Sequence, residues 1–137
     1  MSTGTLRAAF GAALLFGSLC FTQTCFAQSM ESTEGVVLYK AYCASCHGTD
    51  GKGVGPMTEW LKIQSPDLTR IAAREGGRFP LARVQRIIAG EENITRGHGS
   101  REMPVWGPVF SQVGRDQDWG KVRILNLAKY LETLQVR

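Results

Sequence analysis

The stretch Cys43-Ala44-Ser45-Cys46-His47 decides how the rest of this sequence is interpreted. On a helix, residues at positions i, i+3 and i+4 share one face, so this spacing turns two thiols and an imidazole in the same direction. Upstream, Gly35, Tyr39 and Tyr42 fall at helical spacings, and no proline interrupts residues 35–47. We therefore predict one helix over residues 35–47 that ends in three reactive side chains.

The five residues match the C-x-x-C-H pattern of covalent haem attachment, in which both cysteines form thioethers and the histidine reaches the iron. A thioredoxin-like pair belongs at the junction of a strand and a helix, and no segment alternates at period two for long enough to predict a strand. A zinc site needs further ligands, and His98 is the only other histidine in the chain. A local disulfide would leave His47 unused. We expect a single haem c, bound through Cys43 and Cys46.

Residues 1–27 have the layout of a secretory signal. Arg7 is their only charged residue, an apolar run follows it, and Cys25-Phe26-Ala27 resembles a small-x-small cleavage site. We expect cleavage after Ala27, a single domain over residues 28–137, and a location in the periplasm or another extracytoplasmic compartment. An uncleaved N-terminal anchor is the alternative, although so short an apolar run spans a bilayer poorly, and we expect no membrane span in the mature form.

Removal of the signal changes the composition of the chain. The 137 residues become 110, the net charge falls from +4 to +3, and the four cysteines fall to two because Cys20 and Cys25 are lost. A charge of +3 is far short of the clustered positive charge of a nucleic-acid binder. Two cysteines three residues apart build no long-range disulfide framework. A domain of about 110 residues buries only some 60 to 70% of its chain surface, so a planar apolar cofactor would enlarge a thin core.

Two further helices are predicted. Pro80 suits the start of one, which Gly90 ends, and its apolar stripe is Leu81, Val84, Ile87 and Ile88. The last helix runs from about Asp116, a suitable N-cap, to about Leu134; its apolar face is Ile124, Leu127, Ala128, Leu131 and Leu134.

The segments between these helices are rich in glycine and proline. Residues 48–56 are predicted to be a loop, residues 57–78 are mixed with a short helical turn on either side of Pro66, and residues 91–114 are predicted to be a second long loop. The fold class is therefore all-α, with three to five short helices and long Gly/Pro loops. Aromatic side chains in these segments suggest loops folded against something apolar: Trp60, Phe79, Trp106 and Phe110.

Three other motifs accompany the C-x-x-C-H pattern: Gly35-x-x-x-Tyr39, Leu127-x-x-Tyr130-Leu131 and Met103-Pro104-Val105-Trp106-Gly107. With them the chain resembles the class I c-type cytochromes, the monohaem cytochrome c family, over about residues 34–135. The resemblance implies the cytochrome c fold around one haem, with the N- and C-terminal helices crossing at Gly35, Tyr39 and Tyr130. It also implies an electron-transfer protein with redox partner proteins, not an enzyme, and we expect a monomer that binds no nucleic acid.

The same resemblance implies the iron ligands, His47 on one side and Met103 on the other. A thioether ligand favours ferrous iron and raises the reduction potential. His98 is the rival sixth ligand, and Met57 is a third candidate. Pro66 resembles the family proline whose region supplies a carbonyl to the ligating histidine.

Smaller interpretations concern residues around this site. The Trp106 indole suits a haem propionate or simple packing. The arginines at 70, 74, 78, 83 and 86 include candidate propionate partners, although a solvated face explains most of them. The glycines at 48, 51, 53 and 55 are expected to lie close to the haem edge.

Three functions remain open at this level. The first is an exported one-electron carrier in a respiratory-type chain, with both axial positions of the iron filled. The second is a dedicated cytochrome subunit of a larger dehydrogenase or oxidase. The third is a haem enzyme or gas sensor with an open iron site, for which no peroxidase-like acid/base pair is recognisable near His98 and Arg101.

Overall fold

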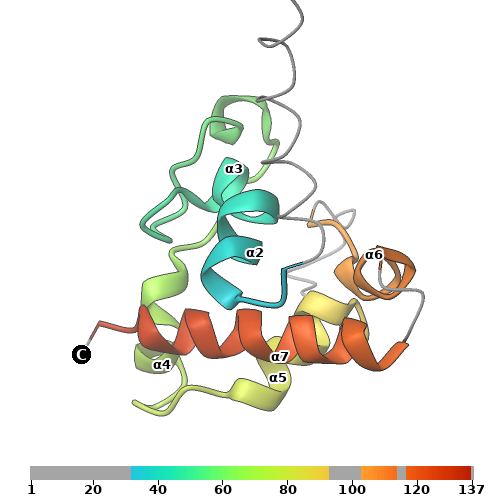
Figure 1. Ribbon diagram of the computed structural model, residues 1–137. Helices are drawn as coiled ribbons and strands as arrows, with labels where there is room; N and C mark the ends of the chain where they lie inside the picture. The colour runs from blue at the N-terminus through green and yellow to red at the C-terminus, as the bar shows by residue number, and fades with distance from the viewer. Residues whose placement is uncertain (1–31, 93–102, 114–116, 137) are drawn as a thin grey trace, which may run out of the picture.

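The computed structural model describes residues 32–92, 103–113 and 117–136 (Figure 1). These residues form six α-helices: α2 (Gly35–Tyr42), α3 (Ala44–His47), α4 (Ile71–Arg74), α5 (Leu81–Ala89), α6 (Trp106–Val113) and α7 (Gln117–Thr133). Two 3-10 turns lie between α3 and α4, at Thr58–Trp60 and Leu68–Arg70. The described ranges contain no strand, so the predicted all-α class is confirmed.

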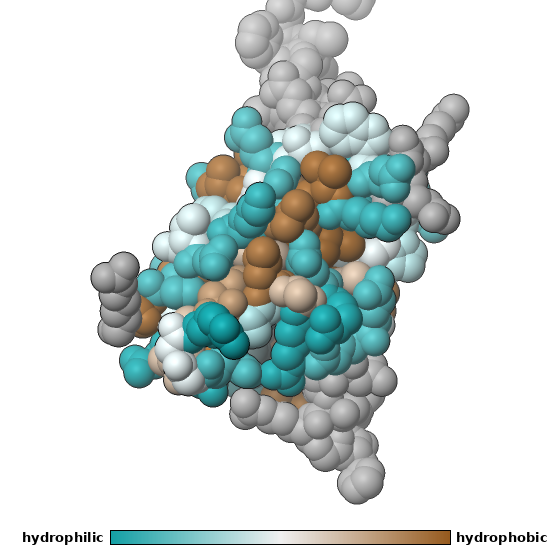
Figure 2. All heavy atoms as spheres, turned by 90° about the horizontal axis from the view of Figure 1, so that it is seen from below, coloured by the Kyte–Doolittle hydropathy of each residue, from teal (hydrophilic) through white to brown (hydrophobic). Residues whose placement is uncertain are grey.

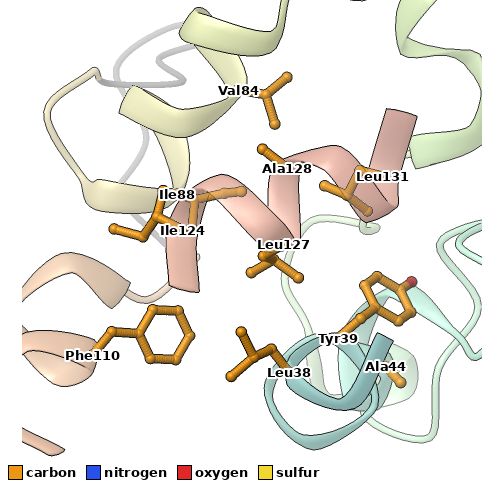
Figure 3. Packing of buried hydrophobic residues seen from close by; sticks show 10 residues of the cluster. All are labelled: Leu38, Tyr39, Ala44, Val84, Ile88, Phe110, Ile124, Leu127, Ala128 and Leu131. Carbon is orange, nitrogen blue, oxygen red and sulfur yellow. The ribbon is translucent and has the colours of Figure 1, made fainter. Parts of the chain in front are cut away.

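The long helix α7 is the centre of the fold, and α2, α5 and α6 pack against it (Figure 1). Figure 3 shows Leu127 of α7 facing α2, while Ile124 lies near Ile88 of α5 and Phe110 of α6. Phe110 and Leu127 are each only 1% exposed. The apolar face that the sequence pattern predicted for α7 is therefore buried against three neighbouring helices. The buried core residues are Leu38, Tyr39, Ala44, Val84, Ile88, Phe110, Ile124, Leu127, Ala128 and Leu131.

The crossing of α2 over α7 depends on Gly35. A Cβ atom on Gly35 would collide with the carbonyl oxygen of Asn126 and would lie 2.8 Å from the Cβ of Tyr130. The Tyr39 and Tyr130 rings meet beside this contact, with centroids 5.3 Å apart. The crossing that the family resemblance implied at these positions is therefore present, because only glycine lets the two backbones approach so closely.

The boundaries of α5 agree with the sequence signals. The helix begins directly after Pro80 and ends at Gly90, which has a left-handed backbone with φ of 86°. The Gly90 N–H donates to carbonyl oxygens at the end of the helix, as expected of a glycine that terminates one. For α7, the apolar face and the C-terminal end agree with the prediction, whereas Asp116 lies outside the described residues.

The helix α6 corrects one prediction, because its residues fall inside the loop expected over residues 91–114. Gly107 and Pro108 argued against a helix, but Pro108 lies in the first turn, where the missing N–H of proline has no helical partner to lose. Tertiary contacts supply the rest: α6 packs along α7, and Phe110 is buried between the helices. Glycine and proline, which usually interrupt helices, therefore led to the wrong prediction of a loop where packing stabilises a helix.

The helix expected over residues 35–47 is present but broken at Cys43, which separates α2 from α3. The break is slight, because the Cys43 N–H still donates to Tyr39 and its carbonyl still accepts from His47, each at 2.9 Å. Both cysteines and the histidine therefore remain on a nearly continuous helical path.

The face that holds α4, α5 and α7 carries hydrophobic atoms in a broken band among hydrophilic ones (Figure 2). Such a mixture is ordinary for the surface of a folded protein. Among the described residues, no helix combines the length and the apolar character that crossing a bilayer requires.

Candidate functional site

The helical turn α3 carries the predicted reactive side chains. Cys43 and Cys46 are both free thiols and half-buried, so neither is tied up in a disulfide. The N–H of His47 donates to the Cys43 carbonyl at 2.9 Å, which closes one helical turn around the motif. The helical turn that the sequence predicted for the cysteines and the histidine is therefore present in the fold.

The orientation of the His47 ring is set by a residue 19 positions away. Its Nδ1 lies 3.4 Å from the carbonyl oxygen of Pro66, and because a carbonyl can only accept, Nδ1 is the protonated nitrogen. Nε2 then keeps its lone pair free. Burial lowers the pKa of His47 and outweighs the opposing effect of the Pro66 hydrogen bond. The ring is therefore a neutral imidazole with one nitrogen available to a metal, and the expected role of Pro66 is confirmed in its geometry.

The environment of Cys43 does not favour a disulfide-exchange role. Burial, followed by the neighbouring Cys46, raises the pKa of the Cys43 thiol to about 12. A thioredoxin-like nucleophile needs the opposite shift, because the thiolate is the reactive species. At neutral pH the Cys43 thiol is therefore protonated, which gives no support to the thioredoxin interpretation.

The loop after α3 is held against the motif by two glycines. The Gly53 N–H donates to the His47 carbonyl at 2.8 Å, and a Cβ on Gly53 would collide with the carbonyl oxygen of Ser65. A Cβ on Gly55 would collide with the carbonyl oxygen of Ser45. The close approaches of these glycines are thus to the chain itself, and Gly53 brings the segment before Pro66 up to His47.

The buried hydroxyl of Tyr39 supports the same turn. It donates to the Gly48 carbonyl at 2.7 Å, and burial raises the pKa of the phenol so that it stays protonated. Asp67, next to Pro66, accepts from both the N–H and the hydroxyl of Thr69, at 2.8 and 2.6 Å. The Tyr39 bond therefore holds the turn after His47, and the two Thr69 bonds hold the chain after Pro66.

Met103 is half-buried and packs against the core. An aromatic cluster ties its segment to the cysteine segment. The Trp106 ring lies 5.3 Å from Tyr42 and 5.7 Å from Phe110, and Tyr42 lies 5.2 Å from Phe110 (centroid distances). Because Tyr42 directly precedes Cys43 and Trp106 follows Met103 by three residues, the cluster holds the two candidate ligand segments together. Sequence reasoning missed Tyr42 in this role, although its position beside the motif was a usable signal.

The remaining predicted residues fall in several places. His98 and Arg101 lie outside the described residues. Met57 is 44% exposed, and its N–H donates to the carbonyl of Ser45, which keeps its main chain on the cysteine side. Trp60 is 72% exposed, so its ring does not pack into the protein core.

The arginines at 70, 74, 78, 83 and 86 are all exposed, as expected of a solvated face. Three of them form ion pairs or hydrogen bonds. Arg83 bonds Glu75 at 2.6 Å and Glu92 at 2.8 Å, Arg86 bonds Glu92 at 3.1 Å, and Arg74 donates to the Asp67 carbonyl at 2.9 Å.

A surface hollow of about 620 Å³ lies elsewhere, between α4 and the end of α7. It is lined by Ala72, Ala73, Gly77, Phe79, Glu132, Thr133, Gln135 and Val136. None of these residues is a thiol, imidazole or thioether, so this hollow is not the redox site.

The residues around α3 fit a haem c. They offer two free half-buried thiols, a neutral imidazole with one nitrogen available, and a half-buried thioether on the neighbouring segment. No group of three or more His, Cys, Asp or Glu side chains that could hold a metal ion occurs among the described residues, so a zinc site gains no support there. One imidazole and one thioether are a known axial pair for haem iron.

A protein-family model described as "Cytochrome c" matches residues 32–135. The chain therefore belongs to the cytochrome c family, which means a haem-binding protein of electron transfer that exchanges electrons with redox partners. Comparisons with curated proteins and with solved structures gave no match.

Proposed function

We propose that this protein is an exported monohaem carrier of single electrons. Cys43 and Cys46 form the two thioether bonds to one haem c, and His47 and Met103 are the axial ligands of its iron. Residues 1–27 are a signal peptide cleaved after Ala27, and residues 28–137 are one cytochrome c domain, a monomer that works in the periplasm or another extracytoplasmic compartment.

The observation that carries the proposal is the bond between His47 Nδ1 and the Pro66 carbonyl, at 3.4 Å. It favours the tautomer with the proton on Nδ1, leaves Nε2 for the iron, and restrains the orientation of the ring. The haem, when bound, supplies an iron that changes oxidation state by one electron. The chain supplies an imidazole oriented by a main-chain carbonyl and a half-buried thioether, and the axial ligands and the hydrogen bonds to them are factors through which a protein sets the potential of a haem.

The assignment of Met103 is supported by its burial and by the aromatic cluster of Tyr42, Trp106 and Phe110 beside it. Filling both axial positions leaves no open iron site for oxygen or peroxide, which favours a carrier over an enzyme. The close alternative is a dedicated cytochrome subunit of a larger dehydrogenase or oxidase, which differs only in its partner.

The attachment is tested by intact mass and by the absorption of the holoprotein after export. We expect a mature chain beginning at Gln28 with the mass of one haem added. Cys43→Ala/Cys46→Ala should lose covalent haem, whereas the matched Cys20→Ala/Cys25→Ala should give the same mature holoprotein as wild type. Wild-type levels of covalent haem in the first double variant would refute the attachment.

The axial ligand is tested by the weak far-red band that methionine gives when bound to ferric haem iron. Met103→Ala should abolish the band, lower the reduction potential and allow carbon monoxide to bind the ferrous protein readily. Met57→Ala and His98→Ala are the matched controls and should leave all three properties unchanged. Loss of the band in a control, with its retention in Met103→Ala, would assign the ligand elsewhere.

A partner subunit is tested by purification at native expression level. A free carrier elutes at the mass of one chain, whereas co-elution of a stoichiometric dehydrogenase or oxidase would favour the alternative.

A further inference from the structure

The end of α5 makes an unusually close contact with the segment that follows Met103. Gly90, which terminates α5, faces the side chain of Val105. A Cβ atom on Gly90 would collide with Cγ1 of Val105 and would lie 3.0 Å from Cγ2 and 3.1 Å from Cβ. Val105 therefore sits in the space that a side chain at position 90 would fill.

Val105 has no easy way to make room. Both methyl carbons of Val105 and its Cβ face Gly90, so turning the side chain about its Cα–Cβ bond would move one methyl away and leave the other against position 90. Valine is also stiff about this bond, because two carbons branch from its Cβ. A methyl group at position 90 would therefore displace the main chain at Val105, two residues from Met103.

A second contact between the same two segments lies next to the first. A Cβ on Gly107 would lie 2.7 Å from the carbonyl oxygen of Ala89, the last residue of α5. This neighbour is main chain and cannot rotate aside. Ala89, the last residue of α5, and Gly90, which follows it, thus meet residues four and two positions beyond Met103, respectively.

We propose that the C-terminal end of α5 is the positioning element for Met103, acting through the contacts of Gly90 with Val105 and of Ala89 with Gly107. The inference rests on the proposed ligation of the iron by Met103. Gly90 and Gly107 are positioning residues, since neither has a side chain that could reach a cofactor. A thioether is a weak ligand that must be held within a few tenths of an ångström, and packed contacts supply that precision better than a flexible chain.

The critical variant is Gly90→Ala, and Gly76→Ala is its matched control. Both glycines have a positive φ, 86° at Gly90 and 70° at Gly76, so alanine strains the backbone in a similar way at each. No described atom lies within 4 Å of a Cβ on Gly76, so the control lacks only the steric contact. The double variant Gly90→Ala/Val105→Ala removes both methyl groups that the new Cβ would meet and leaves the 3.1 Å contact with the Cβ of residue 105, the mildest of the three.

The holoproteins are compared by the ferric far-red band, by carbon monoxide binding to the ferrous form, and by thermal unfolding followed by circular dichroism. We expect Gly90→Ala to lose at least half of the band and to bind carbon monoxide, with Gly76→Ala resembling wild type. The double variant should regain most of the band. A merely structural role would lower the melting temperature and leave the band and carbon monoxide binding unchanged.

The outcomes separate this inference from the proposed ligand. A band that survives Met103→Ala would overturn the ligand assignment and this inference with it. A band that Met103→Ala abolishes, but that Gly90→Ala retains as fully as Gly76→Ala, would overturn the positioning role alone. If Gly90→Ala yields no folded holoprotein, the double variant decides: folded holoprotein with the band supports the inference, and its failure to show the band overturns it.

Discussion

Replacing Gly35 by alanine tests the helix crossing on which the site is built. The new methyl would collide with the carbonyl oxygen of Asn126 and would lie 2.8 Å both from the Asn126 carbonyl carbon and from the Cβ of Tyr130. Two of these three atoms are main chain, so they cannot rotate away. The helices α2 and α7 would have to separate, and α2 leads directly into the cysteine motif.

The expected loss follows from two opposing effects. Overpacking a tight contact costs about 1–3 kcal/mol, and contact with main chain favours the upper part of this range. Alanine in place of glycine at the start of a helix increases the stability of the helix by less than about 1 kcal/mol. We therefore expect a net loss of about 2 kcal/mol in the free energy of unfolding. For a domain of this size each 1 kcal/mol lowers the melting temperature by about 4–8 °C, so the fall should be on the order of 10 °C.

The assay is unfolding of the ferric holoprotein by heat and by guanidinium chloride, followed by far-ultraviolet circular dichroism. The guanidinium midpoint should fall while the slope m stays constant, because the surface exposed on unfolding is unchanged. Gly76→Ala serves as the control for backbone strain without a collision and should cost about 1–2 kcal/mol. A Gly35→Ala protein as stable as wild type would refute the close crossing.

Three further predictions concern stability. Asp67→Ala should cost about 1 kcal/mol at neutral pH through the lost cap. Because the Thr69 hydroxyl bond lowers the folded-state pKa of Asp67, this stabilisation is present above the unfolded pKa of about 3.9 and is lost as pH falls through the lower folded value. The Asp67→Ala and wild-type guanidinium midpoints should therefore converge in acid, and a constant difference down to pH 2 would contradict this. Phe110→Ala should cost about 3–5 kcal/mol because the ring is 1% exposed, whereas Trp60→Ala, 72% exposed, should change the guanidinium midpoint little. Arg123→Met should lower the free energy of unfolding by about 2–4 kcal/mol, because the 4% exposed guanidinium donates to the main-chain carbonyls of Ser32 and Phe110. Urea titration measures this loss, and an unchanged urea midpoint would contradict the prediction.

Several features could be predicted because their signals are local. The C-x-x-C-H spacing needs only the helical repeat to place its side chains on one face. Pro80 and Gly90 mark the ends of α5 through the missing N–H of one and the left-handed backbone of the other. The apolar face of α7 is visible in the spacing of Leu127 and Leu131.

The helix α6 shows where local signals fail. Gly107 and Pro108 are residues that usually interrupt helices, and they led to the prediction of a loop. In the fold Gly107 is needed for contact with Ala89, and Pro108 lies where its missing N–H has no cost. The same two residues thus permit a helix once α5 and α7 are in place to pack against it.

By itself the sequence determined the reactive motif, the all-α class and the main helices, because each depends on residues within a few positions of one another. Only the tertiary structure decided that the Pro66 carbonyl faces His47 and that the Val105 side chain packs against Gly90. These contacts join residues 15 or more positions apart. Their distances depend on how helices and loops pack, and no local periodicity encodes that packing.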